Sequence, residues 1–459
     1  MSSKMKPALR RGTALFCLVA AGSSGTAVLS QQAGGAPLGR SSTITTQLGF
    51  EAGRNLDLDA GSDAKTLRML GALGYSYALR TRQNELTLSA QINPQTEDGG
   101  DHGLYPTLGL GFAHQESRVK IGFQANYAEA RVTDQSLGFD ENTGAIVEFN
   151  GTGTRSVTRL NGGFEGGIDT PLGYSLQLNR SEIDYSDLSE GASYYNSTTD
   201  SAKISLRGDV SSMTSLNLDL GYKHYQAENP DQTDRTSTDA SLGLVRRIDA
   251  LTQLTGSIGR QKIRTERLDE EDENASGAIF SLGGQRMTPL GSYRASYDRI
   301  VTENGNRDQV LVGQDRETQF GKFSGTVGLS KGENGGTDWI GALTYSTELP
   351  RDELSAQMSR ALRTSDDGDD VILTRISGNI THSLSDLNAL DLELMASSTE
   401  YSDRDTMRID ATLAYQRRLT HDVNLRAGVK LGLATETDKD DANAQSLFMT
   451  VSRQFRFLN

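Results

Sequence analysis

Cysteine is almost missing from this sequence, which has one, Cys17, among 459 residues. Beyond that position the chain can form no disulfide, hold no Cys-ligated metal and use no thiol in catalysis. Hydrophobic residues are also few, at 35%, and the mean hydropathy is -0.49. This is too little apolar material for a large conventional core, although a wide β-barrel needs only alternate apolar residues on its outer face.

Helical and basic segments are missing as well. No stretch reaches the roughly 18 apolar residues of a membrane-spanning helix, and we find no helical periodicity. The formal net charge of -14 argues against nucleic acid as a partner, because phosphate binding needs a concentrated basic face. The acidic runs 269–273, 366–370 and 438–441 are interpreted as solvated loops. Such loops would hold divalent cations weakly, and these cations would bridge the loops to the phosphates of lipopolysaccharide. We therefore expect no cofactor and no metal centre.

The first 30 residues have the organisation of a secretory signal peptide. Basic side chains at positions 4, 6, 10 and 11 precede the short apolar segment Thr13–Gly22, and small or aliphatic residues lead up to Ser30. A disordered basic tail is the alternative. Phe16 is too bulky for lipoprotein-type cleavage before Cys17, so we expect no lipid anchor there. Residues 1–30 are assigned to a signal peptide and residues 31–42 to a short periplasmic segment.

The last sixteen residues alternate between apolar and polar side chains, which is typical of a strand with one apolar face. The apolar parity holds Leu447, Met449, Val451, Phe455 and Phe457. Similar segments recur along the chain in pairs joined by short polar turns such as Arg80–Asn84, and this predicts antiparallel hairpins. The apolar faces would be covered by a second layer in a soluble sandwich and would face lipid in a transmembrane barrel.

Short connections alternate with long polar ones, as expected for a barrel with short periplasmic turns and long outer loops. A sandwich has no reason to keep that order. The order holds only if Gln309–Gln314 is a strand, with Val310 and Val312 facing outward. We therefore predict an all-β fold, a transmembrane antiparallel up-and-down β-barrel of about 22 strands, within a range of roughly 20 to 24, with both termini periplasmic. The barrel is assigned to residues 43–459.

An exported chain of alternating strands that ends on an aromatic strand, Ser452–Phe457 (SRQFRF), resembles a Gram-negative outer-membrane β-barrel of the porin type, among the barrel porins linked to surface polysaccharide. The resemblance lies in pattern and not in a specific motif. It implies an outer-membrane location, contact with the lipid bilayer and lipopolysaccharide, and assembly by the barrel-assembly machinery through the C-terminal strand. Two features depart from it: Leu458 and Asn459 follow the last aromatic residue, and Arg453 has outward parity, which requires snorkelling or a register shift.

The inward parity of several strands carries charges of both signs. These predicted pore-lining residues are Lys203, Arg207, Asp209, Asp219, Lys223, Arg375, Asp391, Glu393, Arg408, Asp410, Arg426 and Lys430. Cross-strand ion pairs that close the wall would explain them, and so would a water-filled pore. The sequence predicts a channel for passive or gated passage of hydrophilic solutes or polysaccharide. The alternative is a non-conducting barrel, such as an exopolysaccharide-secretion partner or a surface adhesin scaffold.

The long stretch Asp134–Arg155 is the candidate for narrowing such a pore, because it contains apolar residues that a solvated loop does not need. Its candidate constriction residues are Asp140, Glu141, Ile146, Val147, Glu148 and Phe149. A loop that caps the mouth or lies on lipopolysaccharide is equally compatible with the sequence. The segment expected before the first strand, about Gln31–Ser42, is too short to fold as a plug, so an energised receptor is not expected.

Catalysis has little support. The five histidines are scattered and form no spaced metal motif. His224, with Asp219 nearby in sequence, is the one pairing that suggests a catalytic site. We therefore expect no enzyme activity and assign no catalytic residue.

Overall fold

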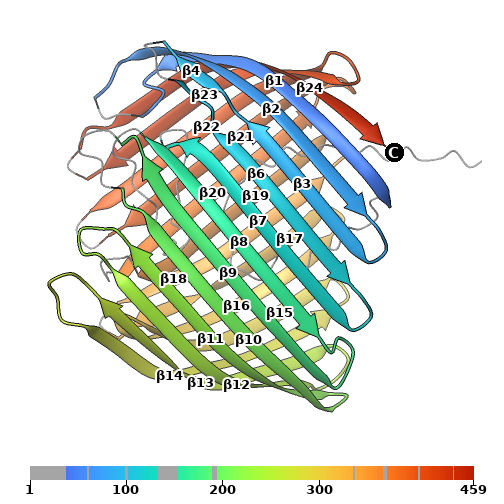
Figure 1. Ribbon diagram of the computed structural model, residues 1–459, viewed down its shortest axis with the longest axis vertical. Helices are drawn as coiled ribbons and strands as arrows, with labels where there is room; N and C mark the ends of the chain where they lie inside the picture. The colour runs from blue at the N-terminus through green and yellow to red at the C-terminus, as the bar shows by residue number, and fades with distance from the viewer. Residues whose placement is uncertain are drawn as a thin grey trace, which may run out of the picture.

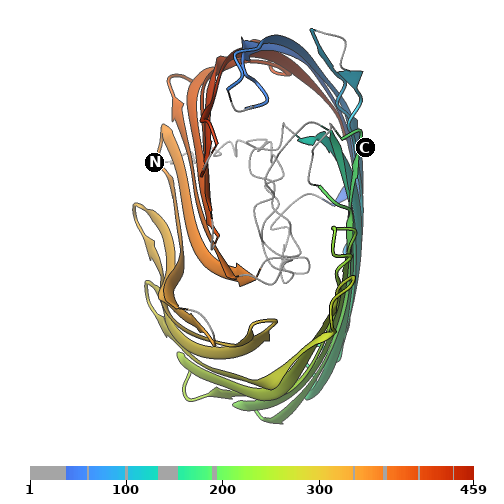
Figure 2. The same ribbon diagram turned by 90° about the vertical axis from the view of Figure 1, so that its left-hand side faces the viewer.

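The computed structural model describes residues 38–58, 61–98, 102–132, 153–188, 194–333, 336–364, 370–401, 404–437 and 439–458. They form one antiparallel sheet that closes on itself into a barrel (Figure 1), because β1 (Gly39–Arg54) pairs with β24 (Ala442–Leu458). Figure 2 shows the strands as a ring that is longer in one direction than in the other. The predicted signal peptide, residues 1–30, lies outside the described residues.

The strands follow one another around the wall. The others are β2 (Lys65–Arg80), β3 (Asn84–Ile92), β4 (Gln95–Glu97), β5 (His102–Gly103), β6 (Pro106–Gln115), β7 (Val119–Arg131), β8 (Thr154–Gly166), β9 (Leu172–Ser186), β10 (Ser197–Ser211), β11 (Thr214–Ala227), β12 (Asp234–Arg247), β13 (Thr252–Glu266), β14 (Glu273–Thr288), β15 (Gly291–Thr302), β16 (Gly305–Thr318), β17 (Gly321–Gly332), β18 (Thr337–Glu348), β19 (Asp352–Thr364), β20 (Asp370–Ser383), β21 (Asn388–Glu400), β22 (Asp405–Arg418) and β23 (Val423–Glu436).

The two shortest strands are continuations of longer ones. β4 pairs with β2 in the same register as β3 does, after an interruption at Pro94, which has no N–H to donate to the ladder. β5 precedes β6 and belongs to the same strand of the wall, because it pairs with β4 in the register that β6 keeps with β3. Tyr105, at φ 37°, interrupts the two parts. The barrel wall therefore has 22 strands, and the predicted fold class and strand number are confirmed. The wall begins at Gly39, within the segment expected to precede it.

The strand at Gln309–Gln314 is confirmed as part of β16, which pairs with β15 and β17 along its length. Val310 and Val312 point outward and are half exposed. The last strand is confirmed too. Its register against β1 and β23 runs without a shift, so Arg453 stays on the outer face, where its guanidinium lies 4.4 Å from the Phe455 ring centroid.

The outer face carries a belt of exposed apolar side chains, as Leu48 at 74% exposure and Ile258 at 63% illustrate. In water such a belt would be unfavourable, whereas lipid covers it without cost. Successive side chains of a strand lie on opposite faces of the sheet, so the residues that alternate with this belt point into the barrel. Few apolar side chains are buried, in keeping with a wall that has no conventional core.

The strict alternation of short and long connections was wrong in two places. The outer connection 401–404, between β21 and β22, is no longer than the turns 384–387 and 419–422 on either side of it. β15 and β16 are joined on the outer side by only two residues, Glu303 and Asn304. Residues 302–308, which precede Gln309–Gln314, belong largely to these two strands, which end in a tight turn. This turn matters below, because it leaves the barrel wall.

A periplasmic turn offers a pH test of local stability. The Asp249 carboxylate accepts hydrogen bonds from the N–H groups of Leu251 and Thr252, both at 2.7 Å, and the first of these is the main reason why the pKa of Asp249 lies below its ordinary value of 3.8. When the pKa of a carboxyl group is lower in the folded protein than in the unfolded one, the group stabilises the fold at pH values above its unfolded pKa. This stabilisation is lost as the pH falls through its folded pKa. We expect Asp249→Ala to lower the urea midpoint at pH 7 and to change it less at pH 3. Equal changes at both pH values would contradict this.

Candidate functional site

The predicted lumen residues all lie on the inner face of the wall. On β11, for example, Leu218 and Leu220 are exposed on the outside, so Asp219 between them points inward. They fall into two groups, one on β10 and β11 and one on β20 to β23, which Figure 2 places on different sides of the ring. The structure thus does not gather them into one site.

Within each group several charges form ion pairs. Lys203 lies 3.7 Å from Asp219, across two adjacent strands. Arg426 donates to Glu393 at 2.7 Å, and its Nε lies 3.9 Å from a carboxylate oxygen of Asp391, which is 4% exposed. Ion pairs of this kind neutralise the wall and leave a polar surface toward the lumen.

Three further residues join the second group but were missed by the sequence analysis. Glu51 on β1, 5% exposed, accepts a hydrogen bond from Lys430 Nζ at 2.9 Å and another from Ser446 at 2.6 Å. Lys430 and Arg426 each lie 5.4 Å from the ring centroid of Phe448. The closing strands β1, β23 and β24 are therefore joined on their inner side by a charged cluster whose carboxylate, Glu51, is buried and whose inward parity could have been read from the sequence.

The outer end of the β15–β16 hairpin turns into the barrel. The pairing of β14 with β15 stops at Phe280 and Arg299, although both strands continue. Val301 has outward parity but is 4% exposed, because it lies against the inner face of the neighbouring wall. Its N–H donates to Gln261 of β13 at 3.4 Å, and a Cβ at Gly277 of β14 would lie 3.1 Å from it.

Glu303 fixes this hairpin end to the wall. Its carboxylate forms ion pairs with Arg235 of β12 and with Arg267, the latter at 3.2 Å. The Glu303 and Arg267 side chains are each 7% exposed, and that of Arg235 is 16% exposed. A carboxylate held between two guanidinium groups at this burial is a strong anchor, because losing either guanidinium weakens the compensation of a buried carboxylate. Arg267 also donates to Glu273 at 2.8 Å, so Arg235 depends on Glu303 more than Arg267 does.

The outer end of the β19–β20 hairpin also turns inward and reaches β16. The pairing of β18 with β19 stops at Gly341 and Arg360. Beyond it, Arg307 of β16 donates to the Leu362 carbonyl at 3.5 Å and to Thr364 Oγ1 at 3.3 Å, and forms an ion pair with Asp370. This end must pass inside β17 and β18, and Ile340 on the inner face of β18 is accordingly 8% exposed.

Asn304 joins the two hairpin ends, since its amide donates to Asp370 at 3.3 Å. We call residues 301–307 together with Leu362–Thr364 and Asp370 the inner strap. The inner strap runs from β12 and β13 on one side to β20 on the other, and Figure 2 shows two hairpin ends curving into the ring. The predicted constriction residues Asp140, Glu141, Ile146, Val147, Glu148 and Phe149 lie outside the described residues.

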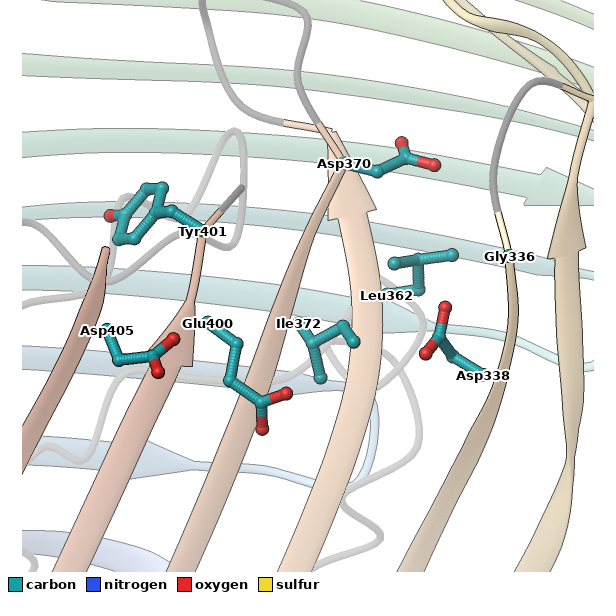
Figure 3. A pocket seen from close by; sticks show the side chains of 8 residues that line it. All are labelled: Gly336, Asp338, Leu362, Asp370, Ile372, Glu400, Tyr401 and Asp405. Carbon is teal, nitrogen blue, oxygen red and sulfur yellow. The ribbon is translucent and has the colours of Figure 1, made fainter. Parts of the chain in front are cut away.

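The inward bend of β19 and β20 opens a pocket of about 330 Å³ beside β18 (Figure 3). It is lined by Gly336, Asp338, Leu362, Asp370, Ile372, Glu400, Tyr401 and Asp405. Two of its four carboxylates are already paired, Asp370 with Arg307 and Glu400 with Arg360 at 2.7 Å. The pocket is therefore an acidic indentation at the outer rim of the barrel.

The suggested catalytic pairing was wrong. His224 Nε2 lies 2.9 Å from Asp234, on the outer face of β11, whereas Asp219 faces the lumen and accepts a hydrogen bond from Ser205 at 2.5 Å. Odd and even positions of one strand lie on opposite faces, so these two side chains cannot act together. In the described part of the chain, no group of three His, Cys, Asp or Glu residues is placed to hold a metal ion.

Comparison with protein-family models and with curated proteins finds no match. Solved structures do match. The FrpB iron transporter from Neisseria meningitidis (F5-1 variant, apoprotein) has a TM-score of 0.57 at 10% identity, over 90% of this chain and 81% of the other. The siderophore receptor PiuA from Acinetobacter baumannii has a TM-score of 0.56 at 10% identity, over 90% and 82%. The ferric enterobactin receptor PfeA (Q482A) from Pseudomonas aeruginosa has 0.55 at 8% identity, over 92% and 82%.

These similarities concern the fold. A closed antiparallel barrel of 22 strands with an apolar outer belt is the fold of an outer-membrane protein of Gram-negative bacteria. The similar proteins are named as transporters and receptors, and not as enzymes or porins. They support an outer-membrane barrel in general and give no support to the porin type or to a link with polysaccharide.

Proposed function

We propose that this protein is an outer-membrane channel for hydrophilic solutes, narrowed on its outer side by the inner strap. The observation that carries the proposal is the wall itself, which is wide, closed, apolar outside and lined inside by hydroxyl, amide and paired charged groups. Barrels of this width commonly enclose an aqueous channel or a plugged lumen. The twelve charged residues predicted from the sequence are proposed to line the pore, and β24 is proposed to contact the assembly machinery.

The inner strap supports a gated passage over a permanently open one. Its anchors are ion pairs between hairpin ends that come from different parts of the sequence, and such contacts have two states, docked and released. In the docked state the two hairpin ends occupy part of the outer half of the lumen. A released strap would leave the wall intact, because β14 to β20 keep their pairing below it.

Planar bilayers test the channel. Purified protein is expected to give stepwise conductance, with larger steps or more frequent opening when the strap is released. Liposome swelling with neutral sugars of increasing size then gives the size limit. Ferric chelates belong among the solutes, because PfeA was solved with enterobactin and FrpB is named as an iron transporter.

A barrel that folds, inserts and shows no conductance under any voltage would overturn the channel proposal. The same result would favour the non-conducting alternative, an accessory or scaffold barrel whose strap keeps the lumen shut. Heat-modifiable mobility on gels is the control that the inserted protein is folded.

A further inference from the structure

The outer face of β13 carries a column of basic side chains directly above its apolar part. Ile258 faces lipid, and the next residues on the same face are Arg260, Lys262 and Arg264, all exposed. On the inner face of the same segment Ile263 and Thr265 are buried. The strand therefore changes on its outer face from apolar to basic within two residues.

The strand pairing places this change at the border of the membrane. Lys262 lies opposite Thr238 of β12, and Thr238 lies opposite Tyr222 of β11. Tyr222 is exposed on the outer face, and aromatic side chains of transmembrane barrels form girdles at the interface between hydrocarbon and headgroups. On the adjacent strands the outward positions also become polar beside Lys262, with Thr238 and Thr236 on β12 and Ser276 and Asn274 on β14, so the basic column begins where the apolar belt ends.

The two lower members of the column have no protein counter-ion among the described residues. Arg264 donates to Asp272 at 2.7 Å and lies 3.0 Å from Glu266. Arg260 and Lys262 have no such contact in the part of the chain that the structure describes. Their cross-strand neighbours are small, Ala240 and Ala278 beside Arg260 and Thr238 and Ser276 beside Lys262, so the two cations stand clear of the surface.

We propose that Arg260 and Lys262 bind the phosphate groups of a phosphorylated lipid in the outer leaflet, with its acyl chains against the apolar face below. The charge of the two side chains fits this lipid, because each cation would meet a phosphate at the membrane interface. Their position fits it as well, because the exposed side chains of Ile258, Leu242 and Phe280 lie directly below and would contact the acyl chains. The inference concerns the outer surface of the wall and holds whether or not the lumen conducts.

The test uses the full-length protein in detergent, titrated with lipid A that carries its phosphates, with dephosphorylated lipid A and with inorganic phosphate. Binding is measured by native mass spectrometry. The variant is Arg260→Gln with Lys262→Gln. The matched control is Arg246→Gln with Arg286→Gln, which removes two exposed arginines from the outer faces of β12 and β14 at the periplasmic end.

Each interfacial cation contributes about fivefold in affinity for anionic headgroups, so the variant is expected to bind phosphorylated lipid A about 25-fold more weakly. The control is expected to bind like the wild type, and dephosphorylated lipid A is expected to bind both proteins weakly. Unchanged binding by the variant, an equal loss in the control, or equal affinity for the dephosphorylated lipid would overturn the proposal. Competition by millimolar inorganic phosphate alone would also overturn it, because it would identify a free-anion site.

Discussion

Replacing Glu303 with alanine is expected to release the inner strap and to increase the single-channel conductance at least about twofold. The substitution removes the carboxylate beside Arg235, while Arg267 keeps its pair with Glu273 at 2.8 Å. Removing one partner of a buried ion pair costs about 3 kcal/mol at the lower end of the usual range. The wall does not depend on this contact, since β15 and β16 pair with each other along their length. The cost therefore falls on the docked position of the hairpin end, and the released position becomes the more stable one.

A matched control exists on the same hairpin. Glu317 of β16 pairs with Lys322 at 3.4 Å, and both side chains are more than 70% exposed. Glu317→Ala should change stability by less than about 0.5 kcal/mol and leave the conductance unaltered. If Glu303→Ala conducts like the wild type, the inner strap is not a gate.

A second way to release the strap keeps every charge. A side chain at Gly277 would lie 2.6 Å from Asn306 Oδ1 and 3.1 Å from Val301 Cγ2, so Gly277→Val should push the hairpin end off the inner face of β14. Agreement between the steric and the electrostatic variants would separate displacement of the strap from a mere change of charge in the lumen.

Gly328→Ala is expected to impair assembly of the barrel. Gly328 faces inward on β17, where a Cβ would clash with the Val310 carbonyl oxygen of β16 and lie 2.9 Å from Leu311 Cα. These atoms belong to the backbone of a paired strand and cannot rotate away, so the two strands would have to separate at a central position. We expect a loss of at least about 3 kcal/mol, the upper part of the range for overpacked sites.

The measurement is the fraction of protein that shows heat-modifiable mobility after folding into detergent or liposomes, together with its urea midpoint. Gly208→Ala on β10 is the control, because no atom lies within 4 Å of a Cβ at that glycine. Gly208→Ala should fold like the wild type. Equal folding of both alanine variants would show that β16 and β17 can separate without loss.

The sequence by itself determined the wall of this protein. Alternation of apolar and polar residues is a local property with a period of two, so it placed Asp219 inside between Leu218 and Leu220. The order of short and long connections identified Gln309–Gln314 as part of a strand. The same alternation assigned the twelve charged residues to the inner face. The assignment of each side chain to a face requires nothing beyond neighbouring residues.

Only the tertiary structure decided where the inner strap lies. The turn at Glu303 and Asn304 resembles an ordinary outer loop in sequence, and its partners Arg235, Arg267 and Asp370 are distant along the chain. Whether a hairpin end continues the wall or turns inward depends on the free energy of contacts between strands that are not sequence neighbours. Period-two alternation carries no information about those contacts, and so it assigned each residue a face of the wall but could not show where strands leave it.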